Sequence, residues 1–288
     1  MHWNKVSVTV YPEQADAIES LLWALGAVSV TFSDSQDNPI FEPPVGEHPL
    51  WQQSEMSALF DQESDLSAIA DAIAAESDAS VHIEALVERA WEREWLDQFK
   101  PMAFGDRLWI VPSVYDSPKE AEVVLRLDPG LAFGTGTHPT TAMILRWLDS
   151  MKINGLSILD YGCGSGILAV AGLLLGAKTA TAVDIDPQAI QATLDNADQN
   201  KVSDRLMTGE VGRVAIGRYD IVLANILAEP LCTLAETLCQ STGVGGTLVL
   251  SGILQSQRDD VAAAYEGRAM VIAEYEEEGW VAMVLKKC

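Results

Sequence analysis

Two aspartates and three glycines lie close together in the middle of the chain, and their spacing predicts a ligand site. Asp160 ends a short apolar run, and Gly162, Gly164 and Gly166 follow at alternate positions. A helix of small apolar residues comes next, and Asp184 ends the apolar run after that helix. Strand, glycine turn, helix, strand and acid together form the nucleotide-binding half of a doubly wound α/β domain.

The two acids indicate which ligand this turn would accept. A carboxylate at Asp184 can accept hydrogen bonds from both hydroxyls of a ribose. The dinucleotide fingerprint G-x-G-x-x-G has glycine where this chain has Ile167. A negative charge at Asp160 disfavours a pyrophosphate and suits a ligand with an amino group or a sulfonium. This pattern resembles the S-adenosylmethionine site of the class I methyltransferases, and the alternative is a structural βαβ unit without a ligand.

Asn225 is a further candidate, because it follows the apolar run YDIVLA at positions 219–224. Strand ends in this architecture point into the ligand crevice. The amide carbonyl of Asn225 could hold the N–H of an amine nucleophile. The alternative is a turn residue that caps a helix over 229–240.

The segment LDPGLAFGTGTHPTT at positions 127–141 contains three glycines close together, which predicts a tight loop. It precedes a helix over 140–150, and we expect it to lie over the strand ends. His138 in this loop could serve as a general base or a metal ligand. The few other histidines give no ligand spacing, so a structural role is favoured and no metal is expected.

Composition narrows the class of protein. The chain has 288 residues, enough for about two domains, and its 18 basic and 42 acidic side chains give a formal charge of −24. Such a surface repels nucleic acid and anionic membranes and would attract basic partners. The alternative, which the charge alone favours, is that it serves only solubility. The four cysteines show no metal-ligand spacing, and Cys163 in the glycine turn is interpreted as packing. No signal peptide is evident, so we expect a cytoplasmic protein.

Hydrophobic periodicity divides the chain into two domains. Residues 1–88 predict the βαββαβ order of a ferredoxin-like substrate-recognition domain, and residues 105–288 predict the α/β domain. Residues 89–104 form the connector, in which Trp91, Trp95 and Phe99 place an aromatic stripe on one helical face. The first domain is expected to have strands at 5–11, 27–32, 56–60 and 80–87, and helices from 12 and over 64–76.

The second domain is expected to alternate strands and helices. Its predicted strands are 107–112, 122–127, 158–160, 179–183, 206–211, 219–224, 247–250, 270–275 and 280–285. Its predicted helices are 140–150, 167–175, 187–200, 229–240 and 255–265.

Several longer segments together resemble the bacterial ribosomal protein L11 methyltransferase family: WEREWLDQFKPMAFGDRLWIVPS, LDPGLAFGTGTHPTT, DYGCGSGILAVA, VDIDPQAI and ANILAEPL. The resemblance covers essentially the whole chain, with one departure at Tyr115, where the family often has Trp. It implies a seven-stranded class I methyltransferase domain that uses S-adenosylmethionine. The implied cofactor contacts are Thr141, Gly162, Asp184 and Asn225.

The resemblance also implies a substrate and a mechanism. Methyl groups would pass to lysine ε-amines and the N-terminal α-amine of ribosomal protein L11, with Asn225 as the catalytic residue. Asp160 and Gly164 complete the expected cofactor site. The first domain would dock the basic ribosomal protein and swing on the connector, and we expect a monomer.

Other classes of function remain open from the sequence. A class I methyltransferase could act on another protein or on a small-molecule amine. An NAD-dependent oxidoreductase is disfavoured by Ile167, and Asn225 at a strand end argues against a protein that only binds the cofactor.

Overall fold

The computed structural model describes residues 3–35, 51, 53–77, 80–86, 99–128 and 136–288. The chain forms two compact units, Met1–Leu96 and Asp97–Cys288. Most of the predicted connector lies outside the described residues, and so do Trp91 and Trp95 of its aromatic stripe. Phe99, the last aromatic residue of the stripe, is buried in the core of the second unit.

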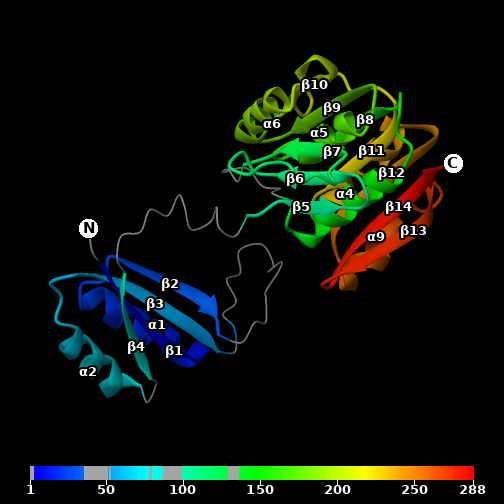
Figure 1. Cartoon of the computed structure of the whole chain (residues 1–288). Coiled ribbons are helices and arrows are strands. Elements are labelled where there is room, and N and C mark those ends of the chain that lie inside the picture. The colour runs from blue at the N-terminus through cyan, green and yellow to red at the C-terminus, as the bar shows by residue number, and fades with distance from the viewer. Residues whose placement is uncertain (1–2, 36–50, 52, 78–79, 87–98, 129–135) are drawn as a thin grey trace. The chain divides into compact units, whose positions relative to one another are not determined.

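The first unit packs two helices on a four-stranded antiparallel sheet of order β2-β3-β1-β4 (Figure 1). Val6, Val8 and Val10 alternate along β1, and they share a core with Ile18 of α1 and Ile73 of α2. The predicted βαββαβ order is observed. The elements are β1 (Trp3–Val10), α1 (Pro12–Ala24), β2 (Ser29–Asp34), β3 (Ser54–Asp61), α2 (Leu66–Glu76) and β4 (Val81–Leu86).

The second unit is built on a seven-stranded sheet of order β10-β9-β8-β11-β12-β14-β13. The strands from β10 to β12 are parallel, whereas β14 runs antiparallel to both of its neighbours. These strands are β8 (Ser157–Tyr161), β9 (Thr179–Asp184), β10 (Leu206–Glu210), β11 (Tyr219–Asn225), β12 (Thr242–Leu254), β13 (Ala269–Glu277) and β14 (Trp280–Lys287). A separate small sheet holds β5 (Met102–Phe104), β6 (Leu108–Val111) and β7 (Val123–Arg126).

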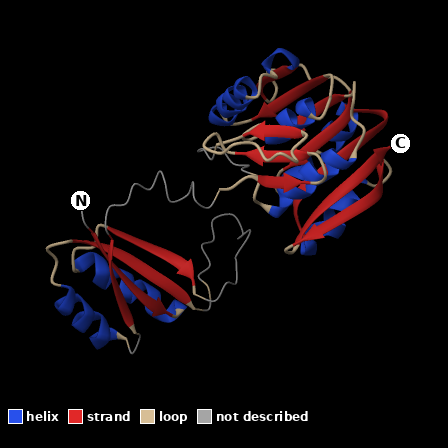
Figure 2. Ribbon diagram, in the orientation of Figure 1, coloured by secondary structure: helices blue, strands red, loops and turns tan. Residues whose placement is uncertain are grey.

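Helices cover both faces of the large sheet, as Figure 2 shows. Leu223 of β11 packs on the side of α4 and α5, and its neighbour Val222 packs on the side of α7, α8 and α9. The helices are α4 (Pro139–Ser150), α5 (Ile167–Leu174), α6 (Pro187–Gln199), α7 (Ala228–Thr233), α8 (Ala235–Ser241) and α9 (Arg258–Tyr265). Two short 3₁₀ turns, η1 (Ser203–Arg205) and η2 (Gln255–Gln257), complete the unit. Within the described chain no helix combines the length and apolarity needed to cross a membrane.

Four elements differ clearly from the sequence prediction. The helix expected over 255–265 is the 3₁₀ turn η2 followed by α9. The helix expected over 229–240 is two helices, because the backbone leaves the helical conformation at Leu234, with φ −88° and ψ 4°. Strand β12 begins at Thr242, five residues earlier than predicted. The prediction missed this start because the glycine-rich run 243–246 normally indicates a loop. The three-residue strand β5 was too short to show a pattern.

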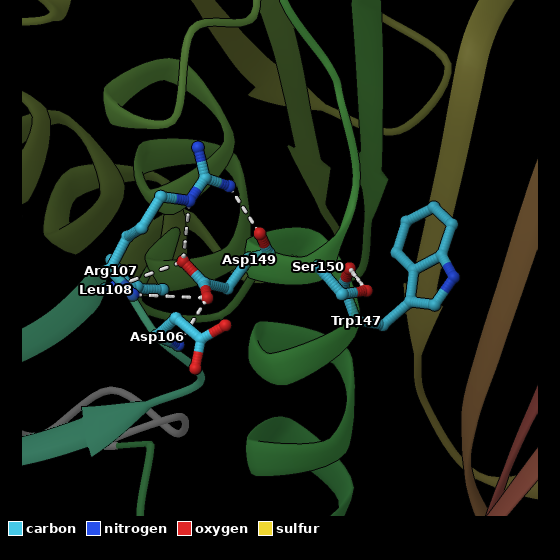
Figure 3. A network of polar contacts seen from close by, with 6 residues as sticks. All are labelled: Asp106, Arg107, Leu108, Trp147, Asp149 and Ser150. Atoms are coloured by element: carbon cyan, nitrogen blue, oxygen red, sulfur yellow. Dashed lines mark hydrogen bonds and ion pairs between the residues drawn. The ribbon is translucent and has the colours of Figure 1, made fainter.

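The carboxylate of Asp149, in the last turn of α4, anchors the turn between β5 and β6 (Figure 3). It accepts backbone N–H groups from Asp106 at 2.7 Å, Arg107 at 3.3 Å and Leu108 at 3.1 Å. The Arg107 guanidinium lies 3.4 Å from the same carboxylate and also donates to the Asp149 carbonyl. A Cβ at Gly105 would lie 2.2 Å from the carboxylate, so this turn requires glycine. The network therefore fixes the C-terminal end of α4 to the small sheet.

Replacing this buried acceptor should destabilise the fold. We expect Asp149→Asn to lower the free energy of unfolding by about 3 kcal/mol, because an amide cannot satisfy three N–H donors and the Arg107 charge together. Urea denaturation followed by circular dichroism measures the loss. Asp259→Asn is the control, since Asp259 pairs with Arg258 on the surface, where solvent screens the pair and it contributes little to stability. Equal stability of the two variants would contradict the role given to Asp149.

Candidate cofactor and amine site

The carboxyl ends of three adjacent strands bring the predicted site residues together. Strand β8 lies between β9 and β11, and the chain leaves β8 toward β9 first and returns to β11 on the other side. Ligands in open α/β sheets bind at such a switch point. Gly162 follows β8 directly, whereas Asp184 and Asn225 are the last residues of β9 and β11. The structure therefore places these three residues together at the carboxyl ends of the central strands.

The glycine turn after β8 uses its own N–H groups to bind neighbouring backbone and Asp184. Gly162 and Cys163 donate to the Val183 carbonyl at 2.8 and 3.1 Å, and Gly164 donates to Asp184 Oδ2 at 2.9 Å. Gly166 donates to the Cys163 carbonyl at 2.7 Å. These donors are therefore not directed at a ligand anion, in agreement with the sequence argument against a pyrophosphate.

The carboxylate of Asp184 is held in place and still has acceptor capacity. Its Oδ2 accepts from Gly164, and its Oδ1 accepts from the backbone N–H of Asp186 at 3.0 Å. A carboxylate has about four acceptor positions, so two hydrogen bonds leave room for others. Asp184 is half-buried at the edge of the sheet, where a ribose could reach it.

Asp160 is a fully buried acid with an unsatisfied oxygen. Its Oδ2 accepts from the Ala169 backbone N–H at 3.1 Å, whereas its Oδ1 is buried with no hydrogen-bond partner among the described residues. Burial raises the pKa of this carboxyl to about 7, with a smaller contribution from the negative charge of Asp184. A nearby cationic group would favour ionisation of Asp160. The acid is therefore suited to a ligand that carries positive charge.

Asn225 and Thr141 are in direct contact although they are far apart in the sequence. The Asn225 Nδ2 donates to Thr141 Oγ1 at 3.0 Å, so β11 and the first turn of α4 meet at this point. Donation by Nδ2 leaves the carbonyl oxygen of Asn225 available as a hydrogen-bond acceptor. The alternative interpretation, in which Asn225 caps the next helix, is wrong, since Leu227 occupies that cap and makes no side-chain cap bond.

His138 caps α4. Its Nδ1 accepts from the Thr140 backbone N–H at 3.4 Å and lies 2.8 Å from the Thr140 hydroxyl, and its ring packs edge-on against Trp280. Burial lowers the pKa of His138, which outweighs the opposite effect of Glu278. A neutral ring is the form that can accept through Nδ1. The structural interpretation of His138 is confirmed.

Cys163 packs inside the glycine turn, as the sequence indicates. Its sulfur lies 3.3 Å from the Thr193 hydroxyl, and the side chain is buried. Burial, together with the charge of Asp160, raises the pKa of the thiol to about 12. Within the described residues, no group of three or more potential metal-ligating side chains is found.

Comparison with known proteins decides the family. The family model described as ribosomal protein L11 methyltransferase (PrmA) matches residues 2–288. The chain belongs to this family. Proteins named ribosomal protein L11 methyltransferase from Chromohalobacter salexigens and Azotobacter vinelandii are 46% and 48% identical to it. The first alignment covers 98% of this chain and 97% of that protein, and the second covers 98% of each.

A solved structure extends the similarity to the fold. The crystal structure of a ribosomal protein L11 methylase from Lactobacillus delbrueckii subsp. bulgaricus has 29% sequence identity and a TM-score of 0.59. The match covers 66% of this chain and 99% of that chain. The seven-stranded class I methyltransferase fold expected from the sequence is therefore confirmed for this member of the family.

The site residues fit S-adenosylmethionine, the methyl donor of this methyltransferase family. Asp160 presents an unpaired buried oxygen, which matches a ligand with ammonium and sulfonium charges. Asp184 retains acceptors for ribose hydroxyls. Gly162, at φ +78°, cannot carry a side chain, because a Cβ there would lie 2.3 Å from Ile226 Cγ2.

Sequence reasoning missed two residues at this edge of the L11 methyltransferase fold. Ile226 lies over Gly162, and Ser251, the register partner of Asn225, carries a fully buried hydroxyl without a partner among the described residues. The only sequence signal for Ile226 as a site residue was its place in the family motif ANILAEPL. The sequence around Ser251 only indicated an apolar strand.

Ionisation of Asp160 should make the cofactor-free protein less stable at higher pH. The pKa is about 7 in the folded state and about 3.8 in the unfolded chain, so unfolding releases a proton between these values. Stability therefore falls as pH rises through this window, and it levels off above the folded pKa.

Asp160→Asn, which cannot titrate, should remove this slope. The free energy of unfolding of the wild type relative to the variant should fall by up to about 4 kcal/mol between pH 4 and pH 8. Chemical denaturation of the cofactor-free proteins across this range measures the difference. A constant difference between the two proteins would refute the raised pKa.

Proposed function

We propose that this protein transfers methyl groups from S-adenosylmethionine to the lysine ε-amines and the N-terminal α-amine of ribosomal protein L11. The whole-chain match to the L11 methyltransferase family supports the substrate. The observation that carries the reaction is the Asn225–Thr141 contact at the carboxyl edge of β11, next to the glycine turn. It leaves an amide carbonyl beside the proposed cofactor site, where a substrate amine needs an acceptor.

We assign the cofactor to residues at the ends of β8 and β9 and in the first turn of α4. Asp184 would accept the ribose hydroxyls, and Asp160 would face the positive charge of the ligand. Gly162 and Gly164 would allow close approach of the cofactor to the turn, and Thr141 would complete the site. When bound, S-adenosylmethionine supplies a methyl group that passes to nitrogen while its carbon–sulfur bond breaks.

The residues of the protein must present the amine in its neutral form. A lysine amine has a pKa of about 10.4 in water and is mostly protonated at neutral pH. Transfer into a partly buried site lowers that pKa, because desolvation disfavours the ammonium, and the proton leaves to solvent. The Asn225 carbonyl would then accept one N–H and orient the nitrogen lone pair. Alignment of two reacting groups alone can supply much of a rate enhancement.

We further propose that residues 1–88 dock the ribosomal protein, and that residues 89–104 join them to the catalytic domain 105–288. The formal charge of −24 supports a basic partner and disfavours direct binding to nucleic acid. We also propose that the protein acts as a monomer. The ribosomal substrate supports a cytoplasmic location.

Methylation of purified L11 tests this function. The full chain is incubated with labelled S-adenosylmethionine and L11, and the intact protein is analysed by mass spectrometry. We expect successive additions of one CH₂, mapped by peptide analysis to amines. Label on another protein or on a small-molecule amine, with none on L11, would contradict the proposed substrate.

Asn225→Ala tests the catalytic assignment. We expect the turnover number for L11 to fall by at least about 100-fold, which is typical for loss of one preorganised polar group in an active site. Steady-state kinetics measure turnover, and a circular dichroism spectrum like that of the wild type verifies folding. Turnover within about twofold of the wild type would refute the role of Asn225.

Asp184→Asn tests the ribose contact. The amide has one acceptor oxygen in place of two, so we expect the dissociation constant for S-adenosylmethionine to rise at least about tenfold. Isothermal titration calorimetry measures the change. Asp195→Asn serves as the matched control, because Asp195 is exposed on α6 and bonds only to Gln191 among the described residues. Equal affinities of the two variants would exclude a ribose contact at Asp184.

A further inference from the structure

Ile226, the residue after Asn225, lies between two glycines. Gly162 directly follows β8, and Gly252 belongs to β12. On the β8 side, the side chain of Ile226 covers Gly162, where a Cβ would come within 2.3 Å of Ile226 Cγ2. On the other side, its backbone lies against Gly252 of β12. We call this arrangement, formed by Gly162, Ile226 and Gly252, the Ile226 clamp.

The contact at Gly252 is made with backbone atoms of Ile226. A Cβ at Gly252 would lie 2.3 Å from the carbonyl oxygen, 2.9 Å from the carbonyl carbon and 3.2 Å from the nitrogen of Ile226. No side-chain rotation can relieve such an overlap. Because the Ile226 nitrogen is bonded to the carbonyl carbon of Asn225, a shift there moves Asn225 directly.

The local pairing of β12 indicates why Gly252 matters at this position. Ser251 is the register partner of Asn225, and the pairing of β12 with β14 is irregular between Leu250 and Ile253. The neighbouring strand β14 therefore does not hold Gly252 in a regular ladder. Gly252 has φ +85°, which L side chains rarely adopt, and it is buried.

We propose that Gly252 is a positioning residue for methyl transfer: its contact with the Ile226 backbone sets where the Asn225 amide meets the substrate amine. The inference rests on the proposed role of Asn225. The residues assigned to ribose and cofactor charge, Asp184 and Asp160, lie on β9 and β8, on the other side of β11. Because these acids lie on other strands, we expect a change at Gly252 to affect turnover much more than cofactor affinity.

Gly252→Ala is the direct test. A displacement of the order of 1 Å at a reacting group can cost about 100-fold in rate, so we expect the turnover number for L11 to fall at least about tenfold. The dissociation constant for S-adenosylmethionine should stay within about threefold of the wild type. Kinetics and calorimetry on the full chain measure the two quantities.

Gly267→Ala is the matched control. Gly267 has a similar left-handed φ of +73°, but a Cβ there meets no atom within 4 Å. It lies before β13, whose first residue pairs with Lys287 at the edge opposite the site. The control carries the same backbone strain without the contact, and we expect wild-type turnover. Turnover in Gly252→Ala equal to that in Gly267→Ala would overturn the proposal.

A double variant separates positioning from general damage to the fold. If Gly252 acts through Asn225, adding Gly252→Ala to Asn225→Ala should lower turnover by less than about twofold further. A full additional loss would overturn the proposal. If Gly252→Ala does not fold, Ile226→Gly takes its place, because glycine loosens the backbone that Gly252 contacts. A folded Ile226→Gly with wild-type turnover would also overturn the proposal.

Asn225→Ala, measured in parallel, distinguishes failure of the premise from failure of the clamp. An active Asn225→Ala variant would refute the proposed role of Asn225 itself. An inactive Asn225→Ala with a fully active Gly252→Ala would refute only the positioning role of Gly252.

Discussion

The hydrogen bonds between the glycine turn and the end of β9 are the constraint on which the site depends. Gly162 and Cys163 donate to the carbonyl of Val183, and Gly164 donates to the carboxylate of the next residue, Asp184. These bonds fold the turn back over β9 and fix an acid at the strand end. They also occupy the donors that a dinucleotide site would direct at phosphate. One set of local bonds thus directs these donors away from a phosphate.

Two anchors hold the helix that completes the site. His138 caps the first turn of α4, where Thr141 meets Asn225, and Asp149 fixes the last turn to the small sheet. Helix α4 also packs against the large sheet through Met143, which shares a core with Trp280. The contact between α4 and β11 is therefore built on a helix that is held at both ends.

Much of this arrangement follows from local sequence, and the rest does not. The turn, Asp160, Asp184 and the strand ending at Asn225 could be predicted because each is encoded in a short, continuous pattern. The bond from Asn225 to Thr141 joins residues 84 positions apart, and the bonds from Asp149 to the β5–β6 turn span 41 to 43 positions. Such contacts depend on packing, and no periodicity reveals them. Gly252 in LSGIL showed only that a glycine interrupts a strand, which is typical of a bulge or of close backbone approach.

The state of Cys163 has a consequence for an enzyme that handles an alkylating reagent. This thiol sits within the turn assigned to an electrophilic methyl donor, and sulfur nucleophiles are methylated more readily than amines once they are thiolates. Burial beside Asp160 keeps the pKa of Cys163 near 12, so almost every copy of the protein carries the unreactive thiol. Burial of Cys163, with a smaller contribution from Asp160, therefore also protects the enzyme from methylating itself.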